Sequence, residues 1–237
     1  MMRLDKLLAE AGTGSRSQVK EYIRKGRITV NGQVCKKPEQ KVSEEEDQIC
    51  LDGQAVEYVC YRYYMLHKPQ GVITATEDTR EKTVLDLLVG VNTAHISPVG
   101  RLDKDTEGLL LLTNDGELAH RLLSPKRHVD KIYYAKTAGR LTEEDCRAFA
   151  AGLTLEDGLV CLPAGLDILS TGEVSEAHVT LREGKFHQVK RMLAARGKPV
   201  LYLERVQMGP LPLDRGLRRG AFRFLTEEEI KGLRALV

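Results

Sequence analysis

Three carboxylates stand close together in the most distinctive stretch of the chain. Asp103, Asp105 and Glu107 fall in a loop over residues 100–108, which leads directly into the four leucines of residues 109–112. The simplest interpretation is a solvated charged loop that precedes a buried strand. A second interpretation is a magnesium-binding cluster, as in a metal-dependent nuclease, because Mg²⁺ prefers oxygen ligands. The spacing alone leaves both open.

A second stretch, residues 183–193, suggests contact with phosphate. A glycine-containing turn leads into a helix whose first residues include His187 and Gln188, and Lys190 and Arg191 follow one turn later. Residues 182–205 contain seven Lys or Arg and two acidic residues, a local charge of +5. Helix N-terminal amides and basic side chains both favour phosphate. The alternative is an ordinary amphipathic helix with a solvated basic face.

Strands and helices that alternate along residues 61–237 are expected to position these residues. Strand-like runs occur at 63–66, 71–76, 109–113, 132–138, 166–169, 176–181 and 200–206. Helices are predicted from Thr83 to near Leu88, after the capping boxes that begin at Thr142 and Thr226, and over 187–195. Residues 114–116, Asn-Asp-Gly, read as a turn. Because strands outnumber helices, we expect an α+β domain with a largely antiparallel, mixed sheet and flanking helices.

The first 57 residues read as a separate, basic domain. Residues 1–41 carry ten Lys or Arg against four acidic residues, a charge of +6, and residues 42–60 carry six acidic residues and no base. The pattern predicts two short helices followed by small hairpins with turns at Asn31-Gly32 and Asp52-Gly53. The basic residues of its helices and of the segment after them are Arg3, Lys6, Arg16, Lys20, Arg24, Lys25 and Arg27.

Composition excludes several classes of protein. The net charge is only +2, the hydrophobic fraction is 42%, and no apolar run approaches the roughly 18 residues that a membrane span needs. The five cysteines are scattered without a Cys-x-x-Cys pair, so neither a disulfide framework nor a zinc site is predicted. We expect a cytoplasmic protein with no metal.

The motifs, taken together, resemble those of the RsuA-type bacterial rRNA pseudouridine synthases. The resemblance lies in Gly-Arg-Leu-Asp-x-Asp-x-x-Gly-Leu-Leu at 100–110 and Thr-Asn-Asp-Gly at 113–116. It continues through His-Lys-Pro-x-Gly at 67–71, Lys-Ile-Tyr at 131–133, Glu-Gly-Lys-x-His-Gln-Val-Lys-Arg-Met at 183–192 and Leu-Thr-Glu-Glu-Glu-Ile at 225–230. Residues 1–57 resemble the small RNA-binding domain first described in a small-subunit ribosomal protein, and the resemblance implies that their basic residues contact RNA: Arg3, Lys6, Arg16, Lys20, Arg24, Lys25 and Arg27. The resemblance therefore covers the whole chain.

The resemblance implies a reaction and roles for particular residues. Such an enzyme detaches uracil from its ribose, turns the ring and rejoins it through carbon, which needs no cofactor. Asp103 would be the catalytic carboxylate, acting as nucleophile at the sugar or as the base that forms a glycal, with Lys190 as its basic partner. Tyr133 would pack against the uracil, and Arg101 would enter the RNA where the target uridine is flipped out. Leu193 or Leu203 would line the uracil pocket, or either belongs simply to the core.

The sequence His-Gln-Val-Lys-Arg at 187–191 and the short C-terminus resemble those of the small-subunit type. We therefore expect 16S rRNA to be the substrate and partner. His187, Gln188 and Arg191 are expected to bind that RNA, and the protein is expected to act as a monomer. Alternatives are a synthase for large-subunit (23S) rRNA, a non-catalytic ribosome-associated RNA-binding protein, and the magnesium-dependent nuclease.

Overall fold

The computed structural model describes residues 1–43, 46–56 and 61–236 of the chain. It contains two compact units, which we treat separately. The N-terminal unit comprises Met1–Arg62 and Gly90–His95, and the C-terminal unit comprises Tyr63–Val89 and Ile96–Val237. The domain boundary expected near residue 57 falls at residues 57–60, which lie outside the described part of the chain.

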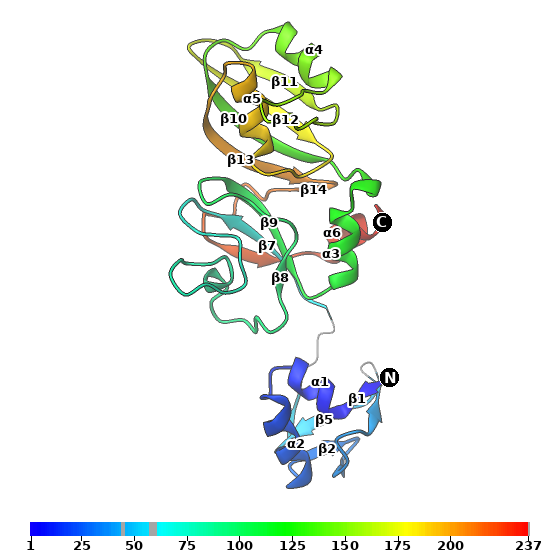
Figure 1. Cartoon of the computed structure of the whole chain (residues 1–237). Helices are drawn as coiled ribbons and strands as arrows, with labels where there is room; N and C mark the ends of the chain where they lie inside the picture. Colours follow the sequence, from blue (N-terminus) through cyan, green and yellow to red (C-terminus); the bar gives the residue numbers. More distant parts are fainter. Residues whose placement is uncertain (44–45, 57–60, 237) are drawn as a thin grey trace. The chain divides into compact units, whose positions relative to one another are not determined.

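Two helices and short strands form the N-terminal unit (Figure 1). Helix α1 (Leu4–Glu10) and helix α2 (Arg16–Arg24) bury Leu4, Leu7, Leu8, Val19 and Ile23. Ser15 caps α2 in a capping box with Gln18. The strands are β1 (Met2–Arg3), β2 (Ile28–Val30), β3 (Gln33–Val34), β4 (Lys41–Val42), β5 (Ile49–Leu51) and β6 (Gln54–Ala55).

Both predicted hairpins of this unit are confirmed. Asn31 and Gly32 join β2 to β3, and Asp52 and Gly53 join β5 to β6. All four turn residues have positive φ, which is the geometry that tight hairpin turns require and that Asn-Gly and Asp-Gly supply.

A nine-stranded sheet forms the centre of the C-terminal unit, in the order β11-β12-β10-β13-β9-β7-β15, with β14 beside β13 and β8 beside β9. These strands are β7 (Tyr63–Lys68), β8 (Ser97–Pro98), β9 (Glu107–Thr113), β10 (Lys131–Ala138), β11 (Gly165–Ser170), β12 (Val174–Leu181), β13 (Val200–Met208), β14 (Leu211–Pro212) and β15 (Phe222–Phe224). Every pair is antiparallel except β9 with β13. The predicted α+β class with a largely antiparallel sheet is confirmed.

Side chains on the two faces of this sheet differ in how deeply they are buried. Tyr133 and Ala135 of β10 pair with Arg205 and Leu203 of β13, so these four share one face, and all are buried. We call it the Tyr133 face. On the opposite face, which we name after Tyr202, side chains of β10 and β13 such as Tyr134 and Tyr202 are partly exposed.

Four helices flank the sheet at its two ends. Helix α4 (Glu143–Ala151) packs on β11, and α5 (Gln188–Ala195) packs on β13, near the upper end in Figure 1. Helices α3 (Gly116–Leu123) and α6 (Glu227–Arg234) lie by the other end, where Leu118, Leu122 and Leu233 join Met65 and Leu111 in one core. None of the helices in the described residues is long and apolar enough to cross a membrane.

Three local predictions were wrong. The strand expected at 71–76 is absent apart from an isolated bridge between Ile73 and Thr83, because Gly71 and Thr74 bond instead to the 102–104 loop. The helix expected after Thr83 is a single 3-10 turn, Leu85–Leu87. The 114–116 turn is the start of α3, where the Asp115 side chain accepts from the Leu118 N–H at 3.0 Å.

Candidate active site

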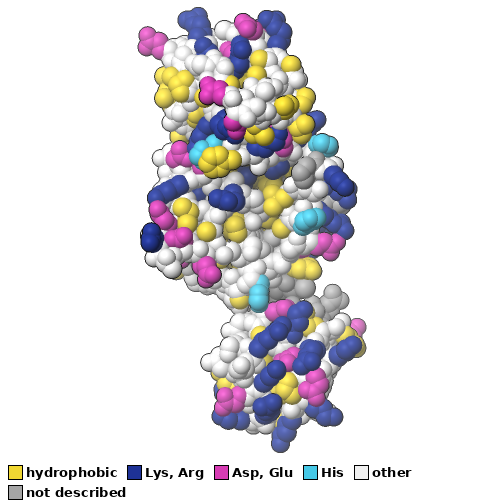
Figure 2. Space-filling model, viewed as in Figure 1, with side chains coloured by type: hydrophobic (Ala, Val, Ile, Leu, Met, Phe, Trp, Pro, Cys, Tyr) yellow, Lys and Arg dark blue, Asp and Glu magenta, His cyan; other side chains and the backbone are white. Residues whose placement is uncertain are grey.

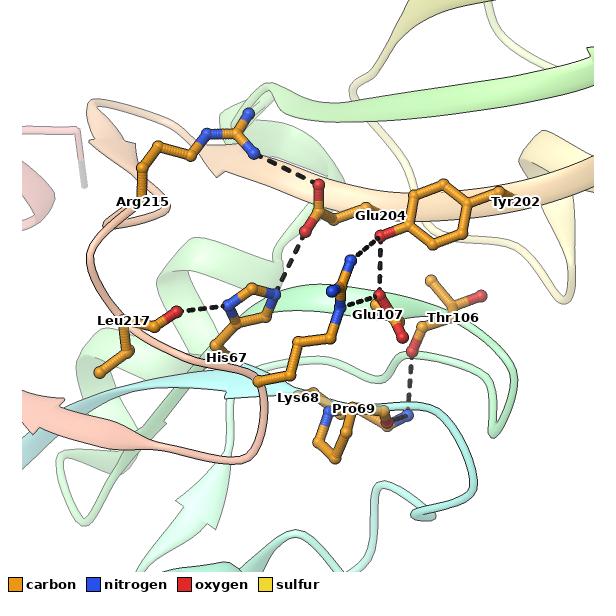
Figure 3. Close-up of polar contacts among 10 residues, drawn as sticks. His67, Lys68, Pro69, Thr106, Glu107, Tyr202, Glu204, Arg215 and Leu217 are labelled. Carbon is orange, nitrogen blue, oxygen red and sulfur yellow. Dashed lines mark hydrogen bonds and ion pairs between the residues drawn. The ribbon is translucent and has the colours of Figure 1, made fainter.

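Lys68 fixes the backbone of the loop that carries Asp103. This last residue of β7 is fully buried, and its Nζ donates to the carbonyl oxygens of Pro69, Asp103 and Thr106 at 3.0, 3.0 and 2.9 Å, and more weakly to that of Lys104 at 3.4 Å. Figure 3 shows its contact with Thr106. Burial lowers the pKa of Lys68 to about 8, although the carboxylates of the loop oppose this shift. The loop is thus attached to the sheet through an interior cation.

The Asp103 carboxylate faces a lysine and a histidine of the α5 segment. Lys190 Nζ lies 3.0 Å from Asp103 Oδ2 and 2.5 Å from Asp105 Oδ1, and His187 Nε2 lies 3.5 Å from Asp103 Oδ1. Burial alone would lower the pKa of Lys190, but its bonds to Asp105 and Asp103 outweigh burial and raise it. Lys190 therefore stays charged, and it stabilises a carboxylate that is still 29% exposed.

The turn before α5 holds these groups in place. His187 is the N-cap residue and adopts φ 50°, a left-handed conformation that is costly outside glycine. Gln188 is buried, and its amide bonds to Glu183 Oε1 at 2.6 Å and to the Lys185 N–H at 3.0 Å. Of the residues expected to bind RNA, His187 thus lies at the carboxylate, whereas Gln188 organises the turn from the interior.

Four residues form a row across the neighbouring strands β10, β13, β9 and β7. Tyr133 of β10 pairs with Arg205 of β13, Arg205 pairs with Gly108 of β9, and Gly108 pairs with Lys68 of β7. Gly108 has φ +103°, and a Cβ there would meet the Arg205 carbonyl oxygen at 2.3 Å, so only glycine allows β9 and β13 to pair here. The row leads from Tyr133 to the lysine that holds the Asp103 loop.

Arg205 is a site residue that the sequence reasoning missed. It is 1% exposed, its Nε donates to the Leu109 carbonyl at 2.8 Å, and its Nη2 has no partner among the described residues. From the sequence, Lys68 stands out only as a member of the His-Lys-Pro-x-Gly motif at 67–71. Both are basic residues within apolar strand patterns, and a buried cation in a strand is the signal that could have pointed to them.

The remaining predicted site residues are placed as follows. Arg101 is exposed, and no ion pair or hydrogen bond of its side chain occurs in residues 1–43, 46–56 and 61–236. Arg191 is paired with Asp157 at 2.5 Å. Leu193 and Leu203 are both buried.

The three carboxylates of the 100–108 loop do not converge. Asp103 and Asp105 share Lys190, whereas Glu107 accepts from Tyr202 at 2.7 Å and from Arg219 at 2.6 Å (Figure 3). Among the described residues, no three His, Cys, Asp or Glu side chains are grouped as metal ligands. This geometry disfavours the magnesium nuclease.

Beside this network, His67 and Glu204 form a buried pair on the Tyr202 face. His67 Nε2 lies 3.2 Å from Glu204 Oε1, and its Nδ1 lies 2.8 Å from the Leu217 carbonyl (Figure 3). The bond to Glu204 raises the pKa of His67, and the bond to His67 lowers the pKa of Glu204. The pair connects β7 to β13.

This pair predicts that stability falls at mildly alkaline pH. Because the folded pKa of His67 is raised, its stabilisation is complete below the ordinary histidine pKa of about 6.5 and is lost as the pH rises through the raised value. We expect the unfolding free energy of wild type to fall by about 1–2 kcal/mol relative to His67→Gln between pH 6 and 8.5. Urea unfolding of both proteins tests this, since glutamine keeps a neutral donor but cannot titrate. Parallel pH curves would contradict it.

In the N-terminal unit, the predicted basic residues form a cavity. Arg3, Asp5, Lys6, Arg16 and Lys20 line about 320 Å³. Asp5 is buried and pairs with Arg3 at 2.8 Å, which leaves the cavity with an excess of positive charge.

The other basic residues of this unit lie at its surface. Arg24 is exposed, Lys25 pairs with Glu21 at 2.6 Å, and Arg27 pairs with Asp52. Figure 2 shows many Lys and Arg side chains on this unit. Such a surface suits a phosphate backbone.

Comparison with known proteins gives matches along both units. Residues 62–195 match the family described as RNA pseudouridylate synthase, and residues 2–49 match the S4 domain. The chain is 45% identical to the uncharacterized RNA pseudouridine synthase YtzG of Bacillus subtilis, over 97% of both chains.

Relatives named for either ribosomal subunit also match. The chain is 42% identical to the ribosomal large subunit pseudouridine synthase B of B. subtilis, over 100% of this chain and 97% of that protein. It is 39% identical to the ribosomal small subunit pseudouridine synthase A of Vibrio cholerae, over 98% of this chain and 99% of that protein.

Proposed function

Because this chain belongs to the RNA pseudouridylate synthase family and carries an S4 domain, we propose that it isomerises one uridine of small-subunit (16S) rRNA, with Asp103 as the catalytic carboxylate. The observation that carries the proposal is the partly exposed Asp103 carboxylate, which pairs with Lys190 at 3.0 Å and lies on a loop whose backbone is held by the buried Lys68. The protein is an RNA pseudouridine synthase of the RsuA type.

The reaction requires that the protein place a charged carboxylate next to the sugar of the target uridine. The bond between ribose C1′ and uracil N1 breaks, the uracil turns, and C1′ joins C5, which gives up its proton while N1 gains one. Asp103 acts either by attacking C1′ or by removing a ribose proton to form a glycal. In both routes an ionised carboxylate meets positive charge at the sugar, the same demand that glycosidases meet. Lys190 orients that carboxylate and sets a positive charge beside it.

Tyr133 and Arg101 are proposed to hold the nucleotide. Tyr133 lies in the row of residues that leads to Lys68, with no hydrogen bond to its hydroxyl in the described part of the chain, and its ring would pack against the uracil. Arg101 is exposed two residues before Asp103, so it would fill the gap that the flipped uridine leaves. His187 and Arg191 would contact the RNA beside them.

We choose the small subunit because of the sequence motif at residues 187–191 and because several relatives are named as small-subunit synthases. A large-subunit synthase is comparably similar to this chain. Incubation with separate 16S and 23S transcripts and with assembly particles, followed by chemical mapping of pseudouridine, tests it. Conversion only in 23S rRNA would move the proposal to the large subunit. Conversion of no uridine would leave an RNA-binding protein without activity.

We expect the enzyme to act in the cytoplasm, as a monomer and without a cofactor. Activity that persists in EDTA on prefolded RNA, together with a monomeric mass in solution, would agree with these expectations. Loss of activity in EDTA would reopen the magnesium interpretation.

The cavity of the N-terminal unit predicts a salt effect. Arg16→Gln combined with Lys20→Gln removes two of the cations that line it. If each contacts one phosphate, the plot of log Kobs against log salt should lose about 1.4 to 1.8 of its slope. Binding to rRNA, measured by filter retention between 50 and 200 mM salt, gives that slope.

A matched control for this prediction is Arg121→Gln combined with Lys231→Gln. Both residues are exposed, and each pairs with a glutamate on its own helix in the C-terminal unit. An equal loss of slope in both double variants would remove the special role of the cavity.

A further inference from the structure

An exposed aromatic ring lies close to the catalytic carboxylate. Phe186 is 74% exposed, although apolar side chains of its size are usually buried. It lies on the turn that leads into α5, directly before His187. Exposure of one large apolar side chain is ordinary by itself, so its surroundings decide what it means.

The turn that carries Phe186 is rigidly held. The Gln188 side chain accepts the Lys185 N–H at 3.0 Å, the Gln188 N–H donates to the Lys185 carbonyl at 3.2 Å, and Gln188 is also bonded to Glu183. These bonds join residues that precede Phe186 in the chain to Gln188, which follows it. The ring is thus presented to solvent from a fixed backbone, so that a ligand would not have to order it.

Phe186 stacks on His187, and His187 reaches the catalytic carboxylate. The two ring centroids lie 3.8 Å apart with an interplanar angle of 18°, and His187 Nε2 lies 3.5 Å from Asp103 Oδ1. The left-handed backbone of His187, at φ 50°, aims both rings. One face of the Phe186 ring is used by this stack, and the other is available to a planar ligand.

The charges around the rings indicate the kind of ligand. Lys185 and Lys190 flank the pair in sequence, and Arg101 is exposed in the same loop as Asp103. A flat apolar surface beside cations matches a nucleobase with its phosphate. A single ring offers too little apolar area for a protein partner.

We propose that Phe186, backed by His187, is a stacking platform for an RNA base next to the flipped uridine. This inference rests on the proposed function. Flipping a uridine exposes the faces of its neighbours, and an aromatic ring can restore one of the lost stacking contacts. Phe186 is thereby a substrate-binding residue that acts on unstacked RNA.

Substitutions at Phe186 test the platform through the kinetics of isomerisation of rRNA. Phe186→Ala should lower kcat/KM at least about tenfold, whereas Phe186→Tyr should stay within about twofold of wild type, since it keeps the ring. Phe186→Leu keeps apolar volume without the ring and should behave like Phe186→Ala. Because the side chain is exposed, none of these changes should shift the melting temperature.

The matched control is Leu169→Ala, which removes an apolar side chain that is 53% exposed on β11. It should leave kcat/KM unchanged. Wild-type kinetics in Phe186→Ala, or equal kinetics in Phe186→Leu and Phe186→Tyr, would overturn the platform.

A second measurement detects stacking without turnover. The chain contains no tryptophan, so Phe186→Trp introduces a single tryptophan, whose fluorescence can be excited selectively over that of the eight tyrosines. Saturation with a 16S rRNA transcript should quench this tryptophan strongly, and should quench a Leu169→Trp control only by light absorption. Equal quenching would overturn the platform. If wild type converts no uridine at all, the proposed function fails, and the quenching experiment still decides the platform independently.

Discussion

Replacing Asp103 with asparagine is expected to lower the rate of uridine isomerisation by at least about 10³-fold, with rRNA affinity nearly unchanged. Asparagine has almost the same shape and can still accept from Lys190, but it carries no charge to meet the developing charge at the sugar. The fold should persist, because the loop is attached through its backbone carbonyls to Lys68 and not through this side chain. Single-turnover conversion of rRNA, with binding measured in parallel, gives both quantities.

Asp105→Asn is the matched control for Asp103. Asp105 lies in the same loop and shares Lys190, but its side chain is 71% exposed. Burial raises the pKa of Asp105, but its bond to Lys190 outweighs burial and lowers it, and the substitution weakens that bond while leaving the Asp103–Lys190 pair in place. We expect a change of less than about tenfold. Substantial turnover in Asp103→Asn, or equal losses in both variants, would remove Asp103 from its role.

Lys68→Met should have the second largest effect, on both stability and rate. Methionine fills a similar volume but leaves the carbonyls of Pro69, Asp103 and Thr106 without their interior donor. Each buried acceptor left unpaired costs about 1–3 kcal/mol, and relaxation toward solvent recovers part of it, so we expect a loss of about 2–4 kcal/mol. Release of the loop should also lower kcat by about 100-fold, since a shift of 1 Å is enough to misplace a catalytic group.

The control for this prediction is Lys104→Met in the same loop. Lys104 is half-exposed and pairs with Glu81 at 2.7 Å, so its loss should cost less than about 1 kcal/mol. Urea unfolding and kcat at a temperature where both variants are folded separate the two effects. Normal kcat in folded Lys68→Met would show that the loop keeps its position without the interior cation.

Local signals explain which elements were predictable. The helices and hairpins of the N-terminal unit were predicted because Ser15, Asn31-Gly32 and Asp52-Gly53 act within a few residues of themselves. The start of α3 was missed because Asn-Asp-Gly is typical of turns. Asp115 caps that helix while it also accepts from Tyr63 at 2.6 Å, a contact 52 residues away that no local pattern contains.

The site was predictable only in part, for the same reason. The family motifs pointed to Asp103 and Lys190, and the structure brings their side chains together. The roles of Lys68 and Arg205 depend on which strand lies next to which. Their chemistry follows from burial at 0% and 1%, which emerges when β7, β9 and β13 assemble. The need for glycine at position 108 likewise becomes evident only once the Arg205 backbone lies next to it.

The pairing of β9 with β13 also bears on the order in which the chain folds. Gly108 and Arg205 lie roughly 100 residues apart, and contacts of such separation carry a large loop-closure entropy and form late. During synthesis, the helices and basic cavity of the N-terminal unit emerge long before β13 does. A chain interrupted before β13 would thus retain the proposed RNA-binding surface but lack the strand that pairs with β9 next to the Asp103 loop. If this surface binds rRNA as proposed, such a truncated product would compete with the full-length enzyme for the substrate.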